Sequence, residues 1–183
     1  MTRQVLFVQG AGKDVHDTWD DKLVASLERA LGAGYAVGYP RMPGEDHPRY
    51  AAWKAALLRE LDALPDGAIV VGHSIGGTML IHALAERPPK CRLAAICLLA
   101  APFIGEGGWP SDEMAPRTDF SQRLPAGVPV FLHHGAEDEI VPTSHVELYA
   151  QAIPHAVVRI LEGRDHQLAN DLGDVARDIR SVR

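Results

Sequence analysis

The chain has 183 residues, of which 46% are hydrophobic and 23% charged, and its formal net charge is −6. This composition is typical of a globular domain, so we expect a single domain over residues 1–183. The negative charge and the lack of any block of Lys or Arg argue against nucleic acid or an anionic membrane as the main partner.

The sequence also lacks the usual signals of membrane insertion and export. Its longest nearly apolar stretch, residues 93–104, is too short to span a bilayer. The first ten residues do not contain the apolar core of a signal peptide. Cys91 and Cys97 fall in or beside one expected strand, which is a poor geometry for pairing. We therefore expect two reduced thiols and a cytoplasmic protein.

Short apolar runs, typical of buried strands, alternate with amphipathic helical patterns along the chain. In chain order, strands are expected at residues 5–10, 35–40, 68–72, 93–100, 128–134 and 156–161. Helices are expected over 19–31, 50–64, 75–86 and 144–152, followed by a closing helix whose apolar stripe is Leu168, Leu172, Val175 and Ile179.

Strands separated by helices predict right-handed crossovers and an α/β fold with about six mostly parallel strands, covered by helices on both faces. Residues 102–127 form one long irregular stretch that is too short to build a cap domain. Its large apolar side chains are expected either to form a flap or to cover the sheet edge: Phe103, Ile104, Trp109, Met114 and Phe120.

The most informative motif is Gly72-His73-Ser74-Ile75-Gly76, where an apolar strand runs directly into a helix. It fits the G-x-S-x-G nucleophile elbow, in which a strained turn exposes the serine above the sheet. Positions two before and two after the serine lie too close to other backbone for a Cβ atom, which explains Gly72 and Gly76. The alternative is a helix N-cap with packing glycines.

Two backbone N–H groups are candidates for an oxyanion hole. The N–H of Ile75 lies at the start of the helix after Ser74, where N–H groups are free and the helix dipole is positive. A second donor is expected after the first strand, where "QGAG" lets the backbone approach a substrate. We assign the Ala11 N–H to this role; the alternative is an ordinary glycine turn.

Nine histidines compete for the role of general base. Only His166 stands in a loop past the last expected strand with a helix beginning behind it. The elbow is expected to turn the side chain of His73 away from Ser74, while His145 and His155 are expected on the surface.

For the acid, Glu137, Asp138 and Glu139 are sequence neighbours beyond the fifth expected strand. The spacing from Gly135 and to Pro142 selects Asp138; the alternative is a solvated acidic turn. A serine, an aspartate and a histidine then follow strand ends in that order, as expected for a serine hydrolase on an α/β sheet.

A metal site at the same sheet edge is the less favoured interpretation. His133 and His134 are adjacent in one expected strand and so point to opposite faces. Both therefore cannot readily bind one ion together with Asp138. We expect no metal and no cofactor.

Three segments together resemble the α/β-hydrolase family: "GHSIGG" its nucleophile elbow, "HGAEDEIVP" its acid loop and "GRDH" its histidine loop. The resemblance covers nearly the whole chain. Within the family, the short length, "YPRMPGEDHPRYAAW" and the start at "VLFVQGAG" are similar to the small serine hydrolases typified by retinoblastoma-binding protein 9. The chain departs from the larger family pattern at Gln9, where a histidine is usual, and in lacking two leading strands and a cap domain. By this likeness the nucleophile, acid, base and two oxyanion donors are Ser74, Asp138, His166, Ala11 and Ile75.

The resulting hypothesis is a serine hydrolase that cleaves small carboxylic esters, thioesters or amides through an acyl-enzyme. Its partner is a small-molecule substrate, and the chain is expected to be a monomer or small homo-oligomer. One alternative is a cofactor-free haloperoxidase or C–C hydrolase with the same triad. Another is a hydrolase-fold binding protein with little turnover.

Overall fold

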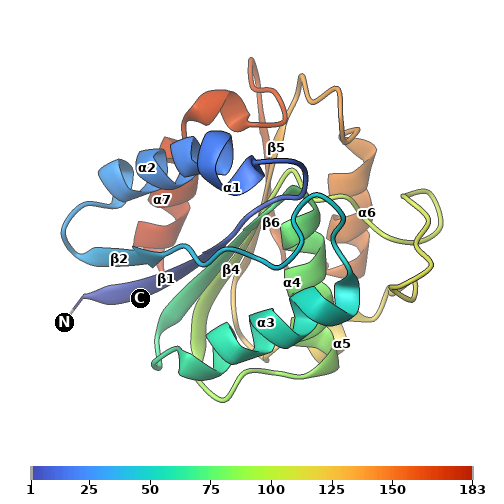
Figure 1. The fold of residues 1–183 in the computed structure, drawn as a ribbon, viewed down its shortest axis with the longest axis horizontal. Coiled ribbons are helices and arrows are strands. Elements are labelled where there is room, and N and C mark those ends of the chain that lie inside the picture. The colour runs from blue at the N-terminus through green and yellow to red at the C-terminus, as the bar shows by residue number, and fades with distance from the viewer. Residues whose placement is uncertain (1, 183) are drawn as a thin grey trace.

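The structure is a computed structural model that describes residues 2–182. Six strands form one sheet in the order β2-β1-β3-β4-β5-β6, and every neighbouring pair is parallel (Figure 1). The strands are β1 (Arg3–Val8), β2 (Tyr35–Gly38), β3 (Ala68–His73), β4 (Leu93–Leu99), β5 (Val130–Gly135) and β6 (Val157–Leu161). The predicted α/β class and parallel sheet are therefore confirmed, and each predicted strand overlaps an observed one.

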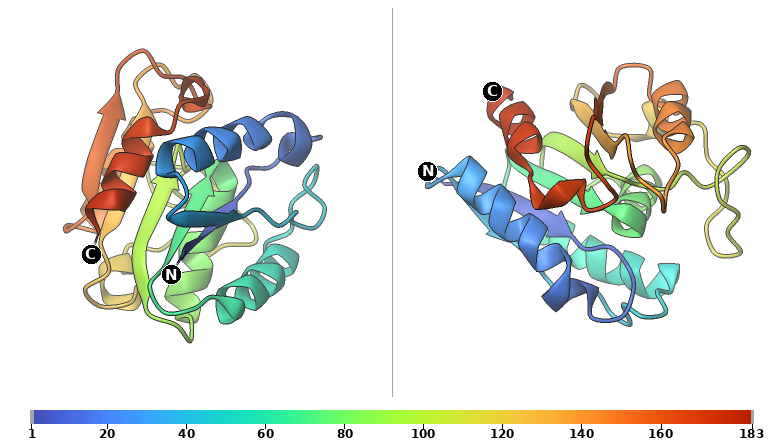
Figure 2. Two further views of the ribbon diagram at one scale, coloured as in Figure 1. Left: turned by 90° about the vertical axis from the view of Figure 1, so that its left-hand side faces the viewer. Right: turned by 90° about the horizontal axis from the view of Figure 1, so that it is seen from above.

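Helices cover both faces of this sheet because its central strands are apolar throughout (Figure 2). On one face, α2 (Asp20–Leu31) and α7 (Gly173–Ser181) pack side by side and share a core with Val5 and Phe7 of β1. On the other face, α3 (Tyr50–Ala63), α4 (Ser74–Glu86), α5 (Phe120–Arg123) and α6 (Ser144–Ala152) contribute to a second core. The short helix α1 (Val15–Thr18) precedes α2.

The order of the strands determines where a site can form. The chain runs outward from β1 to β2 at one edge, and then from β3 through β6 toward the other edge. The direction of winding thus reverses between β1 and β3. In open parallel sheets, ligands bind beyond the carboxyl ends of the strands at such a reversal point. The loop after β1 and the turn from β3 into α4 lie together at this reversal point.

The closing helix begins later than its apolar stripe predicted. Leu168–Asn170 form a short 3₁₀ turn, η1, and α7 starts only at Gly173. Residues 168 to 170 have φ between 50° and 54°, a left-handed backbone conformation that ends the helical pattern. Leu168, Leu172, Val175 and Ile179 are nevertheless all fully buried, so the stripe predicted burial correctly and the helix start wrongly.

The segment between β4 and β5 contains only the four-residue helix α5, so no cap domain is built from the described residues there. Of the two alternatives for its apolar side chains, a covering role rather than a flap fits four of the five. Phe103, Ile104, Met114 and Phe120 are buried in the core. Trp109 remains partly exposed.

None of the helices within residues 2–182 combines the length and apolar character needed to cross a lipid bilayer. Both cysteines are free thiols, as expected, with Cys97 buried in β4 and Cys91 partly exposed before it.

Candidate active site

Ser74 occupies a strained turn between β3 and α4. It is the first residue of α4 and has φ 52°, a left-handed conformation that is unusual for a residue with a side chain. The glycines around it leave no space for a Cβ atom. A Cβ at Gly72 would stand 2.5 Å from the Gly77 Cα, and one at Gly76 would stand 1.9 Å from the Gln9 carbonyl oxygen. The turn has the geometry of a nucleophile elbow.

Ser74, His166 and Asp138 form one hydrogen-bonded chain across three strand ends. The Ser74 Oγ lies 3.0 Å from His166 Nε2, and His166 Nδ1 lies 2.8 Å from Asp138 Oδ2. A carboxylate only accepts hydrogen bonds, so Nδ1 carries the proton and Nε2 is free to accept the serine hydroxyl. The arrangement can deprotonate Ser74 while it attacks an electrophile.

The surroundings of Asp138 keep it ionised. Its Oδ1 accepts the N–H groups of Ile140 at 2.9 Å and Val141 at 2.8 Å, which leaves Oδ2 for His166. Burial raises the pKa of Asp138, but the hydrogen bonds from His166 and these amides outweigh it and hold that pKa below its ordinary value. The neighbouring Glu137 and Glu139 are exposed at the pocket mouth.

The loops that carry Asp138 and His166 are held against each other by backbone contacts. Glu137 N–H donates to the carbonyl of Arg164 at 2.9 Å. Gly135, at the end of β5, lies directly under this crossing, and a Cβ there would stand 2.3 Å from the Arg164 oxygen. The glycine therefore allows the two loops to approach, which brings the carboxylate within reach of the imidazole.

The loop after β1 presents Ala11 to the same pocket. The backbone N–H groups on either side of Ala11 are both hydrogen-bonded. Gly10 N–H donates to Asp20 Oδ2 at 2.7 Å, and Gly12 N–H donates to the Glu45 carbonyl at 2.8 Å. Ile75, the second residue of α4, lines the pocket as well. Its N–H belongs to the first turn, where no intrahelical acceptor exists. Both residues whose amides are expected as oxyanion donors thus line the pocket.

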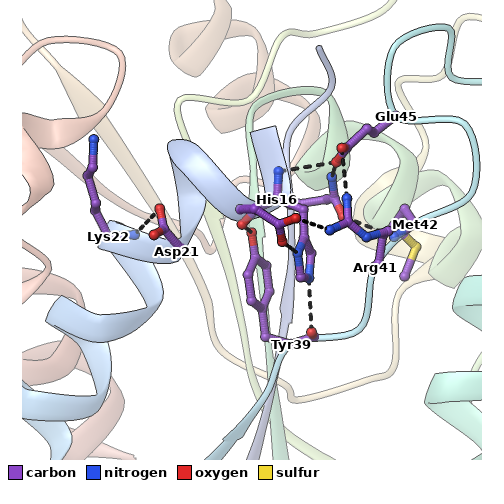
Figure 3. Close-up of polar contacts among 9 residues, drawn as sticks. His16, Asp21, Lys22, Tyr39, Arg41, Met42 and Glu45 are labelled. Atoms are coloured by element: carbon purple, nitrogen blue, oxygen red, sulfur yellow. Dashed lines mark hydrogen bonds and ion pairs between the residues drawn. The ribbon is translucent and has the colours of Figure 1, made fainter. Parts of the chain in front are cut away.

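A polar cluster that the sequence analysis did not find supports the loop after β1. Gln9 is fully buried; its amide donates to the Glu45 carboxylate and accepts the Met42 N–H at 2.9 Å. Figure 3 shows Glu45 between the backbone N–H of His16 and the guanidinium of Arg41, at 3.1 and 2.8 Å. Gln9 thus connects the end of β1 to Met42 and Glu45.

The pocket has a volume of about 820 Å³ and is open to solvent. Its apolar wall consists of Val15, Trp19, Ile75, Trp109 and Ile140. Trp19, expected in the buried stripe of the first helix, is 51% exposed and stands before α2, and Ile140 is 59% exposed. Three carboxylates line the pocket, from Glu137, Glu139 and Asp165, and within residues 2–182 no Lys or Arg does so.

His133, His134 and His145 each have a separate structural partner. His133 donates to Asp178 of α7 at 3.0 Å, whereas His134 donates to the Val141 carbonyl at 2.8 Å, so the two rings do diverge. No cluster suited to a metal ion occurs within residues 2–182. The surface position expected for His145 is wrong. It is 3% exposed, and its Nδ1 accepts the Phe103 N–H at 2.8 Å.

His73 is buried beside the pocket, with one ring nitrogen directed at Asp20 and the other at the His166 carbonyl. Asp20 is fully buried, and the sequence analysis did not identify it. Asp20 and Asp21 begin α2, and acidic residues are common at a helix N-terminus. The local sequence therefore does not distinguish the buried Asp20 from an exposed one.

The sequence profile of the alpha/beta hydrolase family matches residues 5–134. The chain belongs to the alpha/beta hydrolase family. One characterised relative is a pimeloyl-[acyl-carrier protein] methyl ester esterase from Aromatoleum aromaticum, 34% identical over 96 residues. That match spans 47% of this hydrolase and 37% of the relative, so it covers well under two thirds of the relative's length.

Solved structures of similar fold cover almost the whole hydrolase. The ydeN gene product of B. subtilis has a TM-score of 0.76 and 18% identity, covering 98% of this chain and 100% of that one. An esterase domain from Rhodothermus marinus has a TM-score of 0.67 and 24% identity, covering 98% and 84%. At these identities the likeness shows the fold.

Proposed function

We propose that the protein is a serine hydrolase that cleaves small carboxylic esters through an acyl-enzyme formed on Ser74. The observation that supports this most strongly is the chain of contacts from Ser74 Oγ to His166 to Asp138, at 3.0 and 2.8 Å, on the wall of an open pocket. The esterase relative, similar over part of its length, agrees with this chemistry.

The first half of the reaction transfers the acyl group. His166 Nε2 takes the hydroxyl proton as the Ser74 oxygen bonds to the ester carbonyl carbon. The N–H groups of Ala11 and Ile75 stabilise the tetrahedral oxyanion, where one such donor is typically worth about 3 kcal/mol. His166 then gives its proton to the departing alkoxide, and the carbon–oxygen bond of the ester breaks.

The second half releases the acid. A water molecule gives a proton to His166 Nε2 as its oxygen attacks the acyl carbon. Collapse of this second tetrahedral species returns the proton to Ser74 and frees the carboxylic acid. Throughout, the Asp138 carboxylate holds the imidazole in one tautomer and stabilises its positive charge.

The pocket supports a preference for short, uncharged acyl groups. Phe103, Ile104, Met114 and Phe120 are packed in the core and so cannot enclose a long chain over the site. Every CH₂ left in water forgoes about 0.8 kcal/mol of binding. The carboxylates at the mouth, with no lining cation within residues 2–182, disfavour anionic substrates.

Labelling with a fluorophosphonate probe tests this function, because only an activated serine reacts with the probe. The wild-type protein should be labelled, and Ser74→Ala should not. Ser121→Ala, an exposed serine of α5, is the matched control and should be labelled normally. Labelling that persists in Ser74→Ala would exclude Ser74 as the nucleophile, and an unlabelled wild-type protein would favour a binding function.

A further inference from the structure

Asp20 is a buried carboxylate that the proposed reaction does not use. It is the first residue of α2 and has no exposed surface. Burying an ionised carboxylate is costly unless it is paired and hydrogen-bonded. Asp20 Oδ2 accepts the Gly10 N–H at 2.7 Å and His73 Nδ1–H at 2.9 Å, and Oδ1 accepts the Gln167 amide at 3.3 Å.

Each of these three partners is the immediate sequence neighbour of a residue that we assign to the reaction. The partners come from three separate segments: the loop after β1, the last residue of β3 and the loop after β6. One carboxylate therefore connects the backbone segments that present the oxyanion donor, the nucleophile and the base. The neighbouring pairs are Gly10 with Ala11, His73 with Ser74, and Gln167 with His166.

The hydrogen bonds of His73 determine its protonation state. Nδ1 faces the Asp20 carboxylate at 2.9 Å, and Nε2 faces the backbone carbonyl of His166 at 3.1 Å. Both partners only accept hydrogen bonds, so both ring nitrogens carry protons. His73 is then an imidazolium, and with Asp20 it forms an ion pair of no net charge.

The pKa shifts of His73 and Asp20 agree with a charged imidazolium next to a charged carboxylate. Burial by itself lowers the pKa of His73, but the charge of Asp20 and its hydrogen bond outweigh burial, and the pKa of His73 is raised. Burial likewise raises the pKa of Asp20, yet the charge of His73 and the hydrogen bonds to Asp20 leave that pKa lowered.

There is little free space around this pair, so a change in it is transmitted to its neighbours. A Cβ on Gly10 would stand 3.2 Å from the Ser74 Cβ and 3.3 Å from His73 Nδ1. The His73 and His166 rings lie with their centroids 5.0 Å apart. A displaced His73 ring would therefore meet either the nucleophile turn or the general base.

We propose that Asp20 and His73 are positioning residues. They form a buried ion pair that fixes the relative positions of the three segments that carry Ala11, Ser74 and His166. This inference rests on the proposed function. Asp20 does not line the pocket, and His73, which does, is only 1% exposed. Both side chains act through the backbone segments that they hold. Misplacing reacting groups by about 1 Å can cost on the order of 100-fold in rate.

Asp178 of α7 offers a comparison, because it is a second buried aspartate that accepts a hydrogen bond from a histidine of the sheet, although it also pairs with Arg159. Asp178 of α7 accepts a hydrogen bond from His133 at 3.0 Å and is 6% exposed. Neither residue lines the pocket. Asp178→Asn therefore removes a buried carboxylate and weakens its hydrogen bonds with His133 and Arg159, at a place that does not line the pocket.

The test compares Asp20→Asn with Asp178→Asn by thermal unfolding, by kcat and KM on p-nitrophenyl butyrate, and by the rate of fluorophosphonate labelling. Both variants should lower the Tm. Asp20→Asn should lower kcat and the labelling rate about 10- to 100-fold with KM within about 3-fold. Asp178→Asn should leave kcat within about 2-fold. Equal kcat in the two variants would overturn the proposal.

Nitrogen NMR of the histidine side chains tests the ion pair itself. His73 should carry protons on both ring nitrogens at pH 7 in the wild-type protein, and Asp20→Asn should remove one of them. A neutral His73 in the wild-type protein would contradict the ion pair. If Asp20→Asn does not fold, Gln167→Met removes the third contact to Asp20. Because Gln167 also lines the pocket, the expected result is a kcat lowered about 3-fold or more with KM within about 3-fold. An unchanged kcat would overturn the proposal.

These outcomes separate the two proposals. A wild-type protein that the probe does not label would mean that the proposed function fails. A labelled wild-type protein with an equally labelled Asp20→Asn variant would mean that the function holds and the positioning role fails.

Discussion

The backbone carbonyl of Gln9 lies so close to Gly76 that a Cβ atom at position 76 would stand 1.9 Å from its oxygen. The first turn of α4 thus packs directly on the end of β1, and this contact brings the loop with Ala11 beside Ser74. Gly76→Ala cannot be accommodated without separating the two segments. We expect it to lower the Tm by several degrees and to reduce probe labelling.

Gly34→Ala is the control for this prediction, because no atom lies within 4 Å of the place where its Cβ would be built. It should leave both the Tm and the labelling almost unchanged. A fully stable and active Gly76→Ala variant would show that α4 does not pack on β1 as described.

The second prediction concerns the acid that orients His166. Asp138→Asn keeps the shape of the side chain but no longer stabilises the Nδ1-protonated imidazole and its charge, so kcat should fall by about four orders of magnitude. Glu137→Gln and Glu139→Gln change exposed side chains and should leave kcat within about 3-fold on a neutral ester. Steady-state kinetics on p-nitrophenyl acetate measures all three. A larger loss from either glutamate would reassign the acid.

The third prediction concerns the carboxylates at the pocket mouth. The double variant Glu137→Gln/Glu139→Gln should raise kcat/KM several-fold on an ester whose acyl group ends in a carboxylate, since it removes two like charges. The same variant should change kcat/KM little on the uncharged ester of equal length. Because exposed charges are screened by salt, the gain should shrink in 1 M NaCl. An equal gain on both esters would mean that charge is not its cause.

The fourth prediction concerns chain length. Over p-nitrophenyl esters from acetate to palmitate, kcat/KM should peak at two to six carbons, because the core residues of 102–127 leave no tunnel for a longer chain. Trp109→Ala removes part of the apolar wall and should weaken that selectivity. A preference for palmitate would contradict the open pocket.

The fifth prediction concerns stability at low pH. His82 is 1% exposed within α4, and its Nε2 has no hydrogen-bond partner within residues 2–182. Burial lowers the pKa of His82 to about 4, so the folded protein keeps this ring neutral while the unfolded chain takes up a proton. Its contribution to stability is therefore present above pH 6.5 and is lost as the pH falls toward 4.

His82→Leu removes this dependence. Relative to wild type, its free energy of unfolding should improve by up to about 3 kcal/mol between pH 7 and pH 4, as 1.36 kcal/mol per pKa unit implies. Urea unfolding at both pH values measures the difference. His155→Leu, at an exposed position, is the control. A constant difference between His82→Leu and wild type would disprove the neutral buried ring.

Much of the fold could be predicted from local patterns. Continuous apolar runs bounded by glycine and proline predicted all six strands. The inner strands are largely buried, as expected in a parallel sheet, whereas the edge strands β2 and β6 are not, and Val158 and Ile160 of β6 are 36% and 44% exposed. The elbow glycines, the acid loop and the late histidine likewise each stand at a strand end that the sequence marks. The structure brings Ser74, Asp138 and His166 together, and their catalytic role stays a prediction.

Only the tertiary structure shows which long-range hydrogen bonds connect the strand ends and loops around the site. Asp20 contacts Gln167 at a separation of 147 residues, and His145 is buried by a hydrogen bond to Phe103, 42 residues away. Neither contact leaves a periodic signal in the sequence, since a lone polar residue resembles a solvated one until its partner is known. The spacing of apolar residues predicts which face of a helix or strand is buried. It does not predict which distant residues must form hydrogen bonds with a buried polar group to offset the cost of its burial.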